Sequence, residues 1–234
     1  MEEGERVPVG IEGFDEMSNG GFPGNSVNIV TGKAGAGKTT FSTHYALAGG
    51  EDETALYINV DGLRDAVLRN ARQYDMGIEE AVEAGDLYLE DYETVLAERG
   101  EEITGFRDLK RVVSHMIEEL GITRLVVDSV AGLSFVGDSR TQIRGSIINF
   151  IRKIRSHDVT AVLVSECHGE SKTRYGVEEY IGDSLVVLSI EEVDNGLKRY
   201  VSIPKMRYTD HDTSFRPLEI SNEGMVVHEE QVVF

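Results

Sequence analysis

The chain has 234 residues, of which 40% are hydrophobic, so it can bury a sizeable core, and we expect one domain over residues 1–234. The formal net charge is −19 and only seven of the 23 basic residues are lysine, which argues against a nucleic-acid partner and suits a halophilic protein. No apolar run approaches the ~20 residues of a membrane span, no secretory signal begins the chain, and the lone Cys167 excludes an internal disulfide, so we expect a cytoplasmic protein.

Strand-like and helix-like segments alternate along the first three quarters of the chain. The helical segment at 63–74 places Leu63, Ala66, Val67 and Ala71 on one face. The alternation predicts an α/β fold with a mostly parallel, twisted sheet flanked by helices. The expected strands are 27–31, 55–60, 87–89, 125–127 and 160–164, and the other expected helices are 39–48, 106–120 and 143–154.

The pattern changes after residue 183. Four strand-like runs follow at 184–190, 197–203, 215–220 and 225–227. The turn sequences "DNG" at 194–196 and "NEG" at 222–224 separate them, and Asn-Gly is a strong hairpin signal. We therefore expect C-terminal antiparallel strands that extend the sheet.

A phosphate-binding loop is the strongest motif. Gly32, Gly37, Lys38 and Thr39 fit the spacing G-x-x-x-x-G-K-[ST], and the loop follows a strand and opens a helix. Lys38 would reach the β- and γ-phosphates of ATP, and the Thr39 hydroxyl would ligate Mg²⁺. The expected nucleotide-binding residues are Gly32, Lys33, Ala34, Gly35, Ala36, Gly37, Lys38, Thr39 and Thr40.

A second metal ligand should come from a neighbouring buried strand. The run "RLVVDS" ends in Asp128, directly after the apolar residues at 125–127. Ligands of open α/β sheets bind at the carboxyl ends of the strands. We therefore expect Thr39 and Asp128 to hold Mg²⁺ together.

Several longer segments resemble KaiC-like proteins of the RecA superfamily, in the form of a single archaeal-type domain. The resemblance runs from about residue 8 to 228 and includes "VGIEGFDEMSNGGFPGNSVNIVTGKAGAGKTTF", "RNAR", "RYGVEEYIGDSLVVL" and "KMRYTDHDTSFRPLEISNEGMVV". It implies a RecA-like P-loop NTPase core that binds ATP between the subunits of a ring, usually a hexamer.

The resemblance also assigns roles to residues outside the P-loop. It places Lys205, Arg207 and His211 at the γ-phosphate bound by a neighbouring subunit. It makes Glu166 a nucleotide sensor at the end of the strand "AVLVSE", and Asn222 a weaker candidate for contact with the base or ribose. The residue types agree with this role. Two cations and an imidazole lie within seven residues of an otherwise acidic chain, and cations from a neighbouring subunit could offset the charge of the γ-phosphate.

One departure from the family concerns hydrolysis. KaiC-like proteins usually end the strand after the P-loop helix in two adjacent glutamates, whereas this chain reads "LYINVDG", with Asp61 and Gly62 in their place. Aspartate is one methylene shorter, or about 1.5 Å. With catalytic roles assigned to Asp61, Lys38 and Glu166, the substitution predicts firm ATP binding and slow hydrolysis.

Two functional readings remain open. The first is a regulatory ATPase that switches an unidentified protein partner in signalling. The alternative is a RadA-type DNA-binding recombination ATPase, which requires basic and aromatic DNA-binding loops. The stretch after Asp128 offers Phe135, Arg140 and Arg144 but no strong basic cluster, which favours the regulatory reading. A small-molecule kinase lacks a recognisable acceptor site, and Cys167 and His168 lack the spacing of a zinc site.

Overall fold

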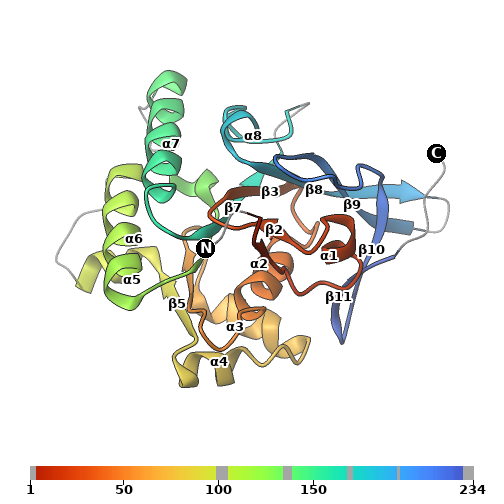
Figure 1. The fold of residues 1–234 in the computed structure, drawn as a ribbon, viewed down its shortest axis with the longest axis horizontal. Coiled ribbons are helices and arrows are strands. Elements are labelled where there is room, and N and C mark those ends of the chain that lie inside the picture. The colour runs from red at the N-terminus through yellow and green to blue at the C-terminus, as the bar shows by residue number, and fades with distance from the viewer. Residues whose placement is uncertain (1–3, 99–104, 134–138, 168–170, 194–195, 229–234) are drawn as a thin grey trace.

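The computed structural model describes residues 4–98, 105–133, 139–167, 171–193 and 196–228 (Figure 1). The strands are β1 Arg6–Val7, β2 Phe22–Pro23, β3 Val27–Gly32, β4 Ala55–Asn59, β5 Leu87–Asp91, β6 Arg124–Asp128, β7 Thr160–Glu166, β8 Ser184–Val193, β9 Gly196–Met206, β10 Arg216–Ser221 and β11 Gly224–Val227. The helices are α1 Phe14–Met17, α2 Lys38–Leu47, α3 Arg64–Gln73, α4 Ile78–Ala84, α5 Tyr92–Glu98, α6 Phe106–Leu120, α7 Arg140–Ile154 and α8 Glu178–Ile181, with a 3-10 turn at Val130–Leu133.

A nine-stranded sheet organises the chain, in the order β11-β10-β9-β8-β3-β7-β6-β4-β5. Every neighbouring pair from β5 to β8 is parallel, whereas β8, β9, β10 and β11 pair antiparallel. The α/β fold class and the antiparallel C-terminal extension are therefore confirmed.

Two hydrophobic cores lie on opposite faces of this sheet, because successive strand residues point to opposite sides. In β6, Val126 belongs to the core shared with α2 and α3, whereas Leu125 and Val127 belong to the core shared with α6 and α7. Figure 1 shows α6 and α7 on one side of the sheet and α2, α3 and α4 on the other. None of the described helices is both long enough and apolar enough to cross a bilayer.

The predicted face of the helix at 63–74 is wrong at its first turn. Val67 and Ala71 are buried, but Leu63 is 66% exposed and Ala66 is also exposed. Leu63 and Ala66 are exposed because the start of α3 lies beyond the carboxyl ends of the strands, where both residues line a cleft instead of packing on the sheet.

Strands pair across both predicted turns. In the first, Val193 pairs with Gly196, and the intervening turn residues lie outside the described part of the chain. In the second, Ser221 pairs with Gly224, which leaves a two-residue turn. These hairpins carry the sheet outward from β8, which lies directly beside the P-loop strand β3.

Candidate nucleotide-binding site

The P-loop leaves the end of β3 and opens α2, as its motif requires. Gly35 and Gly37 have φ angles of +79° and +101°, a left-handed conformation that favours glycine. At Gly32 the constraint is space, because an added β-carbon would lie 2.4 Å from the carbonyl oxygen of Leu188 in β8. The glycines therefore let the backbone turn tightly against the sheet.

The start of α2 presents backbone donors and a lysine. Gly37 is the N-cap residue, and no side chain among the described residues caps it. Unpaired N–H groups at a helix start, together with the helix dipole, favour a bound phosphate. The Lys38 ammonium lies over the same loop and donates to the carbonyl oxygens of Gly32 and Lys33, at 3.0 and 3.1 Å.

The other predicted P-loop residues divide into an exposed and a buried group. Lys33 and Ala34 lie on the exposed surface of the loop, whereas Ala36 is buried. The buried Thr40 accepts a hydrogen bond at Oγ1 from Asn70 of α3, at 3.4 Å, so its side chain anchors the helix. Arg199 of β9 donates to the Gly35 carbonyl at 3.1 Å, a contact that the motif does not predict.

Thr39 and Asp128 meet as predicted for a shared metal site. The Thr39 hydroxyl donates to Oδ2 of Asp128 at 2.8 Å, and the buried Tyr57 hydroxyl donates to the same oxygen at 2.7 Å. Burial and the nearby Asp128 charge raise the pKa of Tyr57 well above its ordinary value, so it remains a proton donor. A hydroxyl and a carboxylate are the hard oxygen ligands that Mg²⁺ uses beside substrate phosphates, so these residues fit that ion.

Asp61 lies beside this pair, just beyond the end of β4. Its carboxylate accepts a hydrogen bond from the Ser129 hydroxyl, and its side chain shares a cleft of about 330 Å³ with Thr39 and Asp128. Partial burial raises the pKa of the Asp61 carboxyl; the Ser129 hydrogen bond opposes this effect, and the Asp128 and Glu166 charges add to it. The cleft is lined by Thr39, Asn59, Asp61, Gly62, Leu63, Ala66, Val67, Asn70 and Asp128.

Glu166 ends β7 directly opposite Gly32 of the P-loop strand. Its carboxylate forms an ion pair with Arg174, at 3.4 Å. The segment that carries Arg174 is also fixed to β3, where the Thr31 hydroxyl donates to the Lys172 carbonyl at 2.5 Å. Glu166 therefore links the start of the P-loop, through Arg174, to the segment that follows β7.

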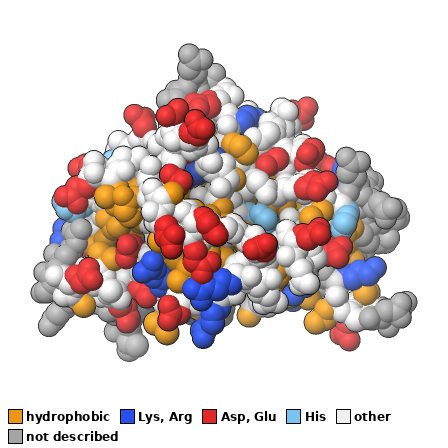
Figure 2. Space-filling model, turned by 90° about the horizontal axis from the view of Figure 1, so that it is seen from below, with side chains coloured by type: hydrophobic (Ala, Val, Ile, Leu, Met, Phe, Trp, Pro, Cys, Tyr) orange, Lys and Arg blue, Asp and Glu red, His pale blue; other side chains and the backbone are white. Residues whose placement is uncertain are grey.

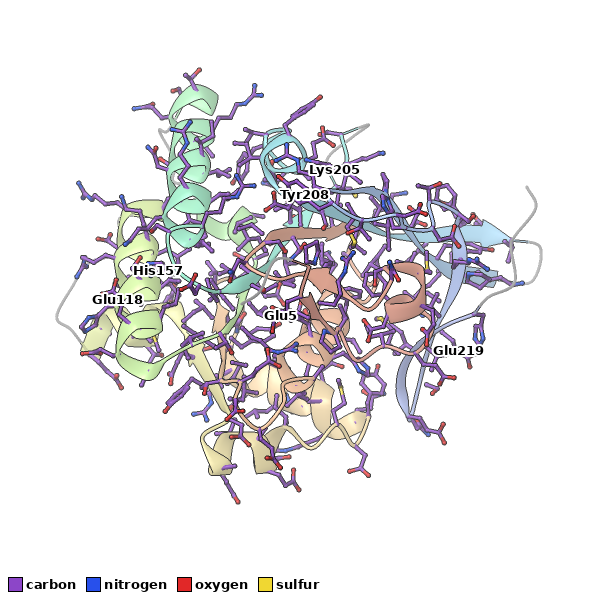
Figure 3. The ribbon with its side chains drawn as sticks, viewed as in Figure 1. Glu5, Glu118, His157, Lys205, Tyr208 and Glu219 are labelled. Atoms are coloured by element: carbon purple, nitrogen blue, oxygen red, sulfur yellow. The ribbon has the colours of Figure 1, made fainter. Side chains whose placement is uncertain are left out.

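Lys205 and Arg207 lie at the amino ends of the parallel strands, away from the carboxyl ends where the P-loop begins. Lys205 donates to the carbonyl oxygens of Glu179, Tyr180 and Gly182, at 2.9, 3.2 and 2.6 Å, and Arg207 lies 3.5 Å from Asp183. Burial and the neighbouring Arg207 lower the pKa of Lys205. Lys205 is labelled in Figure 3, and its carbonyl contacts place its ammonium at α8.

Strand register separates these cations from the P-loop of the same subunit. Lys205 pairs with Leu185 of β8, whereas Gly32 pairs with Leu188. Three strand residues span about 10 Å. Beyond the sheet, the P-loop continues past the carboxyl end of β3, whereas the chain after Lys205 continues past the opposite end of β8. His211 follows on the same segment, and its ring nitrogens lie 3.1 and 3.0 Å from the carbonyl oxygens of Thr209 and Ile203.

The remaining predicted residues are exposed or lie outside the described ranges. Asn222 is exposed in the turn between β10 and β11. Phe135 and His168 lie outside the described ranges, and Arg144 is exposed on α7, a helix that begins at Arg140. Cys167 lies 3.6 Å from the Thr31 hydroxyl, and no cluster of three or more His, Cys, Asp or Glu side chains that could hold a metal ion occurs among the described residues.

Sequence reasoning missed two residues that line the cleft, Asn59 and Asn70. It also missed three that contact the cleft's carboxylates: Tyr57, Ser129 and Gly132. Tyr57 stands in a short apolar strand, where it reads as an ordinary core residue. Ser129 follows the predicted Asp128 directly, and this adjacency is the one available signal. Gly132 carries no motif, because its importance comes from a contact with Asp61 across 71 residues of sequence.

Comparison with known proteins agrees with this geometry. The family description "ATPase: KaiC" matches residues 7–232. The circadian clock oscillator protein KaiC of Prochlorococcus marinus (strain MIT 9313) is 28% identical over 230 residues, which cover 95% of this chain and 46% of that protein. The circadian clock protein KaiC2 of Synechocystis is also 28% identical, over 95% of this chain and 40% of its own length.

A solved structure resembles the whole fold. It is the KaiC-like protein PH0186 from Pyrococcus horikoshii, with a TM-score of 0.84 and 29% identity, covering 96% of this chain and 99% of that one. The chain thus spans less than half of the two curated relatives but nearly all of the archaeal structure. With its P-loop, its Thr39–Asp128 pair and this match over almost its full length, the chain belongs to the KaiC family of ATPases.

Proposed function

We propose that this chain binds ATP with Mg²⁺ at the P-loop and hydrolyses it slowly, as a nucleotide-dependent switch for a protein partner. The observation that carries the proposal is the Thr39–Asp128 contact of 2.8 Å, which lies in one cleft with Asp61. Lys38 and the N–H groups at the start of α2 hold the phosphates, and Thr39 and Asp128 hold the metal. An Mg²⁺ ion held there would supply positive charge that offsets the charge of the phosphates.

Slow hydrolysis follows from the residues beside that cleft. Asp61 is the carboxylate placed to orient the attacking water, and its neighbour is Gly62 where the family usually has a second glutamate. A displacement near 1 Å in a positioning group costs roughly 10²-fold in rate. The ATP-bound state is therefore long-lived, which is what a switch requires.

A neighbouring subunit completes the site in this proposal. Lys205 and Arg207 lie at the opposite end of the parallel strands from the subunit's own P-loop, so they serve a site on another copy. Two exposed aromatic residues stand beside them, Tyr180 at 68% and Tyr208 at 88% exposure, as expected for a surface that another copy covers. A head-to-tail contact closes into a ring when the rotation between successive copies divides a full turn, and we expect a hexamer.

The acidic surface separates this proposal from a DNA-binding recombinase. Figure 2 shows acidic side chains spread over much of the face seen from below, with basic side chains gathered near its lower centre and at one side. Such a surface repels phosphate backbones and remains dispersed in concentrated salt. No contact among the described residues favours the recombinase alternative.

The direct test is nucleotide binding by calorimetry in concentrated KCl. Lys38→Ala removes a charge-assisted phosphate contact and should weaken ATP binding strongly. Lys198→Ala, which removes an exposed lysine on β9, is the matched control and should leave the affinity unchanged. Equal ATP affinity in wild type and Lys38→Ala would overturn the proposal.

The rate is tested by steady-state ATPase assays on the wild type, Asp61→Asn, and the double variant Asp61→Glu with Gly62→Glu. We expect slow wild-type turnover, far below the ~10 s⁻¹ median of enzymes generally, and faster turnover in the double variant. Asp61→Asn should lower turnover further, to a small residual rate. Brisk wild-type turnover would contradict the switch, because the ATP-bound state would then be short-lived.

A further inference from the structure

The Asp61 carboxylate occupies a site made by the chain that follows Asp128. One side of this site is the Ser129 hydroxyl, which donates to Oδ2 of Asp61. The other side is the α-carbon of Gly132: an added β-carbon there would lie 1.4 Å from Oδ1, 2.5 Å from Cγ and 3.1 Å from Oδ2. The carboxylate thus fills the space that a side chain at position 132 would need. Ser129 and Gly132 are called the Asp61 seat below.

The glycine in the Asp61 seat is required by this contact and not by backbone conformation. Gly132 lies in the 3-10 turn Val130–Leu133, and its φ is outside the left-handed region, unlike those of Gly35 and Gly37. An alanine could therefore adopt the same backbone without strain. What the alanine would displace is the end of one flexible side chain, Asp61.

The seat joins three parts of the site. Ser129 directly follows Asp128, so the seat fixes Asp61 relative to the proposed metal ligand. The same turn is held from the other side, where the Tyr175 hydroxyl donates to the Ala131 carbonyl at 2.9 Å. Tyr175 belongs to the segment that pairs with Glu166 through Arg174. A shift in that segment would therefore reach the Asp61 carboxylate through the turn.

We propose that Ser129 and Gly132 are positioning residues for hydrolysis: the glycine makes room for the short Asp61 side chain, and the hydroxyl orients its carboxylate toward the cleft that holds Thr39 and Asp128. This inference rests on the proposed ATPase function. It explains how a carboxylate about 1.5 Å shorter than glutamate retains a defined place near the phosphates. It also makes turnover depend on two residues that do not contact the nucleotide.

The first experiment is Gly132→Ala, assayed for ATPase turnover and for ATP affinity. Because the alanine displaces only Asp61, kcat should fall roughly 10²-fold, while ATP affinity stays within about twofold of wild type since Lys38 and Thr39 are untouched. The matched background is Asp61→Ala, in which the added methyl group has free space. There, Gly132→Ala should cause no further loss of kcat.

Additive losses in this cycle would overturn the inference, because they would show that Gly132 acts independently of Asp61. Unchanged turnover in Gly132→Ala would overturn it as well. Ser129→Ala adds a second arm: it should lower kcat without changing ATP affinity, and it should also lose its effect in the Asp61→Ala background. Circular dichroism on every variant checks that the fold is retained.

A readout without turnover separates this inference from the proposed function. The side-chain ¹³C signal of Asp61, assigned by its disappearance in Asp61→Ala, should change chemical shift in both Gly132→Ala and Ser129→Ala. An unchanged signal would overturn the seat even in an active enzyme. If the wild type binds ATP but never hydrolyses it, both the proposed hydrolysis and the positioning role fail. A shifted Asp61 signal would in that case still show that Ser129 and Gly132 contact Asp61.

Discussion

His44 shows how one side chain can make the stability of this protein depend on pH. Its Nε2 accepts the Met225 N–H at 2.9 Å, so the neutral ring carries its proton on Nδ1, which lies 3.1 Å from the Gly10 carbonyl oxygen. Burial lowers the pKa of His44. Protonation of the folded protein would also remove the acceptor for Met225.

We predict that acidification destabilises the wild type more than His44→Gln. The unfolded chain protonates His44 near its ordinary pKa of about 6.5, whereas the folded chain does so only at lower pH, so the unfolding free energy falls as pH drops below about 6.5. Glutamine cannot titrate and can still accept from Met225. Urea unfolding at several values between pH 8 and pH 5.5 measures this difference. Parallel pH profiles of the two proteins would contradict the assignment.

Tyr57 provides a second prediction at the scale of a residue. Its hydroxyl donates to the Asp128 oxygen that also accepts from Thr39. Losing a hydrogen bond that orients a metal ligand typically costs 10- to 100-fold in metal affinity, so Tyr57→Phe should weaken Mg²⁺ binding by about that factor. The measurement is a Mg²⁺ titration of the ATP complex. Tyr88→Phe, on the neighbouring strand β5, is the control and should leave the titration unchanged.

The residues of the candidate nucleotide-binding site differ in how far the sequence could predict them. Gly32, Lys38 and Thr39 follow a spacing that the phosphate chemistry itself requires, and Asp128 follows from its place after a buried strand. Tyr57 and Gly132 act through contacts between distant segments, so no local pattern marks them. Asn222 stays a prediction, as do the roles of Glu166, Lys205, Arg207 and His211.

Arg124 is a buried joint between several elements. Its guanidinium donates to both Glu53 oxygens, at 3.0 and 2.9 Å, and to the carbonyl oxygens of Pro8 and Tyr45, at 2.8 and 3.0 Å. It also lies over the Tyr45 ring, 5.1 Å from its centre. These contacts tie the start of β6 to the end of α2 and to the N-terminal segment.

We predict that Arg124→Met lowers the unfolding free energy by about 3 kcal/mol, because it removes the charge partner of the Glu53 carboxylate and the donor to two carbonyl groups. This is the lower end of the range for buried pairs, since the Glu53 side chain is 28% exposed. Denaturant unfolding measures the change. Arg72→Met is the control: its pair with Glu79 has side chains 56% and 43% exposed and should contribute at most about 1 kcal/mol. Equal losses in both variants would contradict this account.

Elements were predictable where hydrophobic periodicity continued long enough. The helix at 106–120 was expected with the bounds it has, and strands β3 to β7 were expected within one or two residues. Strand β8 continues three residues beyond its expected end at residue 190. The four-residue helices α1 and α8 are too short for a periodic signal. Helix α7 begins before the expected residue 143, because Ser139 and Gln142 form a capping box whose signal precedes the apolar run.

At the scale of the whole molecule, we predict that ATP with Mg²⁺ promotes assembly. A nucleotide that contacts two subunits stabilises their association by mass action. Arg207→Ala should weaken this effect, and Arg152→Ala, which removes an exposed arginine of α7, should not. Light scattering in concentrated KCl is the measurement, because salt screens the repulsion between copies of a chain with net charge −19. A wild type that remains monomeric at saturating ATP would contradict the proposed trans arrangement.

The P-loop and Arg207 lie at opposite ends of the parallel strands, and this placement has a genetic consequence. Under the proposed arrangement, Lys38→Ala and Arg207→Ala each disable every site when present alone, but they damage different sides of the subunit contact. In a mixture, an Arg207→Ala subunit keeps its P-loop and can borrow Arg207 from a Lys38→Ala neighbour. Random mixing in equal amounts would restore about a quarter of the sites. Two inactive alleles should therefore complement each other when expressed together.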